Sequence, residues 1–189
     1  LANAEYKNQN LKKAVQDINS GIYKLRGFSP VKKRRLFLVD YYYTLGKINF
    51  QLENKFKMSN CFDTVLKWKP NDIITLNNYS YFLAKLNYRL DYALEMIEKV
   101  NKAFPNDATF LDTYAFILYK MKKYSEAEER IKFCLENGGK KNPETCLHAA
   151  AIFKLTDQIE LYQLYYQHAL DYGIDKDQIE KVINGSIEQ

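Results

Sequence analysis

Three features of the sequence predict an all-α fold. We expect a solenoid of antiparallel helix pairs with an extra helix at its carboxyl end. Glycine and proline are scarce, at 7 and 4 of 189 residues, and the long stretches are rich in Leu, Lys, Glu, Tyr, Ala and Asn. Related motifs recur about every 35 residues, which is typical of helical repeat arrays. Signals for helix starts and stops follow the same period. Together these features argue against a β-sandwich or barrel.

The repeat is marked by a small residue that follows an apolar or aromatic one, at Gly46, Ser80, Ala115 and Ala150. A second amphipathic segment opens 12 or 13 residues later, at Met58, Ala93, Ala127 and Tyr162. Short helices are marginal alone, so we expect the two helices of each unit to pack closely. Small residues at the crossing permit that approach.

This pattern resembles the tetratricopeptide repeat, a helix-turn-helix unit of about 34 residues. The stretch from Tyr42 through Leu45-Gly46 and Phe62 to Pro70 matches the family signature most fully. The resemblance implies a right-handed superhelix whose first helices line a concave groove. The segments FPNDATFLDTYAFILYK and YSEAEERI are also similar in sequence to bacterial cell-envelope members of the family. That likeness favours the periplasm or cell envelope, with the cytoplasm as the alternative.

We predict a single domain over residues 1–189, divided at the repeat boundaries. Its parts are a partial repeat and loop (1–30), four repeats (31–72, 73–107, 108–142 and 143–174), and a capping helix with a tail (175–189). No run of about eighteen apolar residues occurs, so no transmembrane segment is predicted. Because the chain opens at Leu1 without an initiator Met, we expect a piece of a longer protein. A signal peptide, lipid anchor or further repeats would then lie outside it.

Helix ends support this division independently of the family. Asp72 and Asp107 are predicted to cap first helices. Ser125 and Asp157 each have a Glu three residues later, which is the spacing of a capping box before a second helix.

The helix predicted around residues 108–121 carries apolar residues on three sides. One side is expected to meet its own second helix and another the preceding repeat. The third side holds Asp112, Phe116, Tyr119 and Lys120, which such packing leaves unexplained. We therefore predict that this side faces the concave groove and contacts a partner.

The predicted function is a non-catalytic scaffold that binds a protein or peptide segment in the groove. Aromatic rings give rigid contact area, and amides can hydrogen-bond an extended backbone. The alternative is that rings such as Phe116 only pack between adjacent first helices. The predicted partner-binding residues are Tyr43, Lys47, Phe50, Asn77, Asn78, Tyr81, Lys85, Asp112, Phe116, Tyr119 and Lys120.

No catalytic, metal-binding or cofactor-binding residue is predicted. P-loop, GxGxxG, GxSxG and HExxH motifs are absent. His148 and His168 are interpreted as structural or surface residues, since neither has a nucleophile or carboxylate at a catalytic spacing. The three cysteines are expected to be buried thiols, and they leave the redox compartment open.

Charge is unevenly distributed along the chain. Residues 1–70 hold 14 Lys and Arg against 5 Asp and Glu, whereas residues 71–189 hold 14 against 18. The basic part includes the run Lys32, Lys33, Arg34 and Arg35. This run defines the alternative function, electrostatic binding of nucleic acid or an anionic surface. Protein is the favoured partner, and the oligomeric state stays open.

Overall fold

The computed structural model describes the backbone of residues 2–25 and 31–184, and the side chains of residues 9–25 and 35–184. Within these ranges the chain forms ten α-helices and no strand, so the all-α prediction is confirmed. The chain divides into two compact units, Leu1–Phe82 and Leu83–Gln189. None of the helices in the described ranges is long and apolar enough to cross a membrane.

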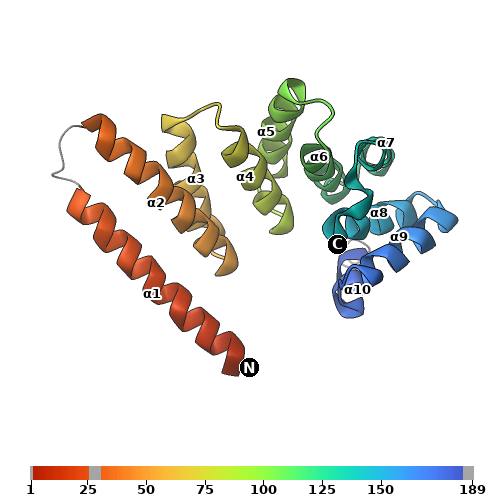
Figure 1. The fold of residues 1–189 in the computed structure, drawn as a ribbon, viewed down its shortest axis with the longest axis horizontal. Coiled ribbons are helices and arrows are strands. Elements are labelled where there is room, and N and C mark those ends of the chain that lie inside the picture. Colours follow the sequence, from red (N-terminus) through yellow and green to blue (C-terminus); the bar gives the residue numbers. More distant parts are fainter. Residues whose placement is uncertain (1, 26–30, 185–189) are drawn as a thin grey trace. The chain divides into compact units, whose positions relative to one another are not determined.

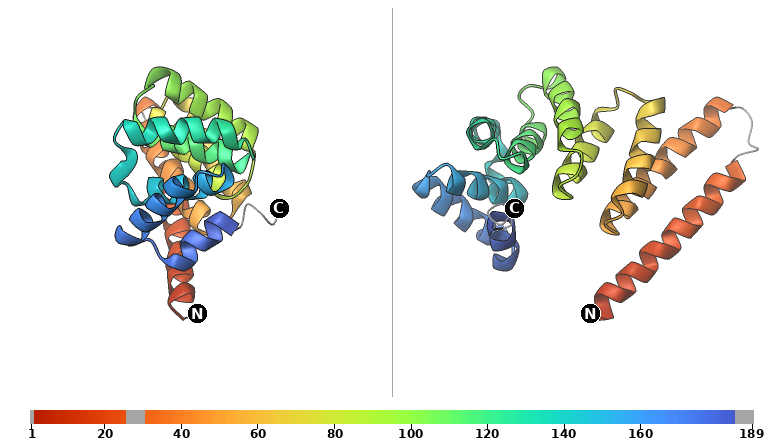
Figure 2. Two further views of the ribbon diagram at one scale, coloured as in Figure 1. Left: turned by 90° about the vertical axis from the view of Figure 1, so that its right-hand side faces the viewer. Right: turned by 180° about the vertical axis from the view of Figure 1, so that it is seen from behind.

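The first unit contains α1 (Ala2–Lys24), α2 (Val31–Gln51), α3 (Lys55–Trp68) and most of α4 (Ile73–Lys85) (Figure 1). Helix α1 is a single long helix that runs antiparallel to α2, as Figure 1 and the right-hand view of Figure 2 show. Helices α2 and α3 pack against each other as the pair predicted for residues 31–72. The loop predicted before Pro30 lies outside the described residues.

The crossing of α2 and α3 depends on the absence of a side chain at Gly46. A Cβ atom at this position would lie 2.7 Å from the ring of Phe62, closer than real Cβ contacts. Phe62 is fully buried, and its ring stacks on Tyr79 of α4 with centroids 5.0 Å apart. The ring therefore lies between Gly46 and Tyr79, and the predicted small-residue crossing is present here.

Replacement of this glycine should destabilise the fold, although alanine favours helix by about 1 kcal/mol. We expect Gly46→Ala to lower the free energy of unfolding by about 1 kcal/mol, because overpacking a core costs about 1–3 kcal/mol. The matched control is Gly21→Ala in α1, where a Cβ would meet Tyr41 at an ordinary 3.4 Å. That variant should be neutral or more stable. Urea denaturation measures both, and equal stabilisation by the two changes would contradict the close contact.

The second unit begins within α4 and continues with helices joined mostly by short turns (Figure 1). Its elements are α5 (Leu90–Ala103), α6 (Ala108–Lys120), α7 (Tyr124–Glu136), the 3₁₀ helix η2 (Gly139–Lys141), α8 (Pro143–Leu155), α9 (Ile159–Asp171) and α10 (Lys176–Asn184). Helices α6 and α7 form one closely packed pair, and α8 and α9 form another. Each of the four predicted repeat ranges thus contains two helices, while the single-domain division itself stays a prediction.

The turn inside each helix pair contains a residue with left-handed backbone. These residues, 34 or 35 positions apart, are Glu53, Asn87, Lys122 and Asp157, with φ between 46° and 62°. Beyond this turn, the amide of Lys123 donates to the carbonyl of Leu118 at 3.0 Å. A left-handed residue with such a bond closes the end of a helix and satisfies a carbonyl that would otherwise lack a partner.

This turn corrects two of the predicted caps. Helices α7 and α9 start at Tyr124 and Ile159, and the residues before them make no side-chain capping bond. Ser125 lies inside its helix and Asp157 in the left-handed turn, so neither closes a capping box. The prediction at Asp107 is confirmed, since its carboxylate accepts from the amides of residues 109 and 110.

All three cysteines are free and buried. Burial raises the pKa of the thiols of Cys61 and Cys146 to about 11 and that of Cys134 to about 12. At neutral pH they are protonated small apolar groups, as the sequence predicted.

Because these pKa values are higher in the folded than in the unfolded chain, their contribution to stability is complete below about pH 8.5 and is lost as pH rises toward 11. We expect the free energy of unfolding to fall between pH 9 and 11. Each cysteine should contribute a slope of up to about 1.4 kcal/mol per pH unit. Urea denaturation across this range tests the effect. Cys61→Ala should make the slope shallower, and an unchanged slope in that variant would contradict the assignment.

Candidate functional site

In the second unit, the first helices α6 and α8 are joined by a buried polar contact. His148 Nδ1 on α8 lies 3.0 and 3.1 Å from the two carboxylate oxygens of Asp112 on α6. An ionised carboxylate only accepts, so His148 Nδ1 must carry the proton and donate. The His148 side chain is buried and the Asp112 side chain only 12% exposed. The contact therefore links neighbouring repeats and offers no substrate access to the imidazole.

Phe116 is part of the same packed layer. Its ring stacks on the imidazole of His148, with centroids 4.1 Å apart and an interplanar angle of 20°. Only 3% of Phe116 is exposed. This ring thus packs between α6 and α8, which is the alternative that the sequence left open.

Tyr119 is covered by the capping helix. Its ring is 1% exposed, and its hydroxyl donates to the backbone carbonyl of Val182 in α10 at 2.9 Å. Helix α10 packs mainly on α8 and also on α9, with Ile179 and Ile183 buried (Figure 2). The predicted capping helix is present, and it covers the end of the stripe that was expected to face a partner.

Two lysines form the solvent-exposed border of this layer. The ammonium groups of Lys85, in the last turn of α4, and Lys120, at the end of α6, lie 5.9 and 6.0 Å from the centroid of the Phe116 ring. Lys85 also forms an ion pair with Glu144 of α8 at 3.4 Å. Burial, and then the charge of Lys85, lower the pKa of Lys120. Two ammonium groups therefore lie beside one buried aromatic ring.

The first unit has a comparable cluster between α2 and α4. Asn78 donates to the hydroxyl of Tyr43 at 2.6 Å, and Asn77 donates to Asn78 at 3.1 Å. Phe50 stacks on Phe82 with centroids 4.2 Å apart. These contacts join a first helix to the next first helix, as the Asp112 contact does in the second unit.

The remaining predicted residues differ in how exposed their side chains are, and only the exposed side chains can contact a partner. Lys47 is exposed, with its ammonium group 5.5 Å from the centroid of the Tyr43 ring, and Tyr81 is half-buried. The expectation that the whole stripe is open is corrected for its four buried members, which are Asn77, Asp112, Phe116 and Tyr119. The sequence missed this for Asp112, Phe116 and Tyr119 because their partners, His148 and Val182, lie 32 to 63 residues away. Partner binding at this face stays a prediction.

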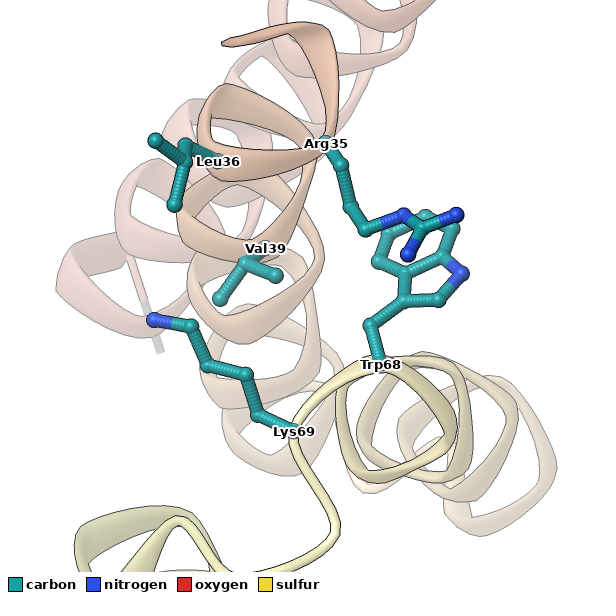
Figure 3. A pocket seen from close by; sticks show the side chains of 5 residues that line it. All are labelled: Arg35, Leu36, Val39, Trp68 and Lys69. Atoms are coloured by element: carbon teal, nitrogen blue, oxygen red, sulfur yellow. The ribbon is translucent and has the colours of Figure 1, made fainter. Parts of the chain in front are cut away.

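The basic run is described only at Arg35, which is exposed; the side chains of Lys32, Lys33 and Arg34 lie outside the described residues. Arg35 lines a pocket of about 300 Å³ together with Leu36, Val39, Trp68 and Lys69 (Figure 3). This pocket was not predicted from the sequence. The signal that would have found it is a lone Trp between two lysines, in a helix that pairs with the basic run.

No group of three His, Cys, Asp or Glu side chains that could hold a metal occurs within the described ranges. His168 is half-buried among aromatic rings, 5.6 Å from Tyr165 and 6.2 Å from Tyr172 between centroids.

The fold is shared with several solved structures. A tetratricopeptide repeat protein from Parabacteroides merdae superposes with a TM-score of 0.71 at 16% identity, covering 96% of this chain and 66% of that one. PilF from Pseudomonas aeruginosa gives 0.62 at 14% identity, covering 95% and 85%. PilW, described as a widely conserved type IV pilus biogenesis factor, gives 0.63 at 16% identity, covering 96% and 86%. No protein-family model and no curated protein matches the sequence. The chain has the tetratricopeptide-repeat fold.

The contact between α6 and α10 can be tested through the Tyr119 hydroxyl. We expect Tyr119→Phe to lower the free energy of unfolding by about 1 kcal/mol, because it leaves the part-buried Val182 carbonyl without its donor. The control is Tyr114→Phe on the same helix, whose hydroxyl bonds to Glu98 at an exposed site. That change should have an effect of less than about 0.5 kcal/mol.

Hydrogen exchange adds a local measurement for the same pair of variants. Amides of α10 should exchange faster in Tyr119→Phe only. If both variants behaved alike in stability and exchange, the hydroxyl would not hold α10 in place.

Proposed function

We propose that this protein is a non-catalytic scaffold that binds a protein segment along the face of its first helices. In the second unit, that face combines a closely packed floor with a cationic border. The observation that carries the proposal is the placement of Lys85 and Lys120 beside the buried ring of Phe116. A partner would meet a surface that is already rigid, which reduces the ordering cost of binding.

The chemistry of this face suits a partner with acidic groups. Lys85 and Lys120 are half-exposed, and each can donate to a carboxylate. Glu144, also half-exposed, shares the border and can orient Lys85 through their ion pair. In the first unit, the corresponding region of α2 and α4 holds the ammonium group of Lys47 and the phenol hydroxyl of Tyr81.

Solved structures with the same fold support this role by analogy. PilW is described as a pilus biogenesis factor, so one protein of this architecture acts in the assembly of a surface structure. By the same analogy we propose that this chain works in a bacterial cell envelope. A fold alone carries many functions, so the site must be tested directly.

Photo-crosslinking at the lysine border is the direct test. The variant Lys120→benzoylphenylalanine carries a photo-crosslinking side chain at this border, and it should capture a protein from an extract of the native organism. The same probe at Lys102, exposed on α5, should not capture it. Equal capture at both positions would contradict a binding face on the first helices.

A matched pair of double variants then measures the role of charge. Lys85→Gln with Lys120→Gln should reduce capture of the crosslinked partner by at least about fivefold, because two charged contacts are lost. Lys99→Gln with Lys102→Gln removes the same charge from an exposed part of α5 and should leave capture unchanged. Thermal unfolding of all variants checks that the fold is kept.

A further inference from the structure

The pocket between α2 and α3 is apolar inside and cationic at its border. Val39 is buried and Trp68 half-buried, while Leu36 remains 59% exposed beside them. Arg35 and Lys69 complete the lining. Figure 3 shows Arg35 and Trp68 on one side of Val39 and Lys69 on the other. A ligand in the pocket would therefore have a cation on each side.

The described residues around this pocket are basic. Residues 35–39 and 64–71 contain three Lys and Arg and no Asp or Glu. The local potential is therefore positive, and it favours an anionic ligand over a neutral or cationic one. An apolar pocket with this border fits a ligand that carries both an apolar group and negative charge.

From this geometry we propose that the pocket binds an acidic protein segment through one bulky apolar side chain. Tryptophan and arginine are the residues most enriched at the energetic centres of protein interfaces, and Trp68 and Arg35 line this pocket together. Carboxylates that flank the inserted side chain would meet Arg35 and Lys69.

This site is separate from the lysine border of the second unit, so the inference goes beyond the proposed function. It concerns residues of α2 and α3 in the first unit only. Loss of binding at one site does not require loss at the other.

Trp68 makes the pocket directly observable, because it is the only tryptophan in the chain. The probe is a panel of acidic peptides of about nine residues, with Leu, Ile, Met or Phe at the centre and Asp or Glu around it. We expect at least one peptide to change the Trp68 fluorescence saturably, with a Kd below about 100 μM at about 0.15 M salt. If no peptide of the panel saturates below about 1 mM, the proposal is wrong.

Two control peptides separate charge from apolar contact. Replacing every Asp and Glu by Lys, or the central residue by Ser, should each weaken binding by at least about tenfold. Stronger binding of single-stranded DNA or of phosphatidylglycerol vesicles than of any peptide would overturn the proposal, because it would assign the site to phosphate groups.

Variants then place the peptide in the pocket. Arg35→Glu and Lys69→Glu should each weaken binding by about tenfold, and Leu36→Ser by about threefold. The control is Lys57→Glu, an exposed residue near the start of α3, which should change the Kd by less than about twofold. Circular dichroism verifies folding, and equal effects of Lys57→Glu and Lys69→Glu would overturn the assignment.

Discussion

Close approach of the two helices within a repeat is the constraint on which the rest of the first unit depends. At Gly46 the backbone of α2 comes so near to Phe62 that a Cβ atom would collide with the ring. The same ring contacts Tyr43 edge-on at 5.7 Å and stacks on Tyr79 at 5.0 Å between centroids. One small residue thus sets both the packing inside a repeat and the contact with the next first helix. In the second unit the fully buried Ala115 and Ala127 occupy the corresponding positions.

The contacts between successive first helices explain why so little of the expected binding face is open. Tyr43 bonds to Asn78, 35 residues later, and Asp112 to His148, 36 residues later. Aromatic and amide side chains on this face are therefore used to hold the repeats in register. What remains for a partner is mainly the flexible cations, whose long stems reach past the packed rings to solvent. The recognition by charge that we propose rests on that division.

Several features of this protein were accessible from its sequence. The 35-residue period, the scarcity of glycine and proline, and the small residues at each crossing predicted helix pairs, because they report local propensity and short-range packing. The cap at Asp107 was predicted correctly for the same reason, since a capping bond spans only three residues. The capping boxes at Ser125 and Asp157 were not, because a left-handed turn shifts the start of the second helix.

Which side chains of the candidate surfaces are exposed was decided by the tertiary structure. The sequence shows that Phe116 and Tyr119 are aromatic, but it does not show whether their side chains are exposed. They are buried because α8 packs on Phe116 and α10 covers Tyr119. The Trp68 pocket likewise requires two helices whose lining residues are about 30 positions apart in the chain. The periodicity of apolar residues along one helix predicts which residues share a face. Exposure of that face depends on surfaces brought together by folding, and such long-range contacts leave no local pattern in the sequence.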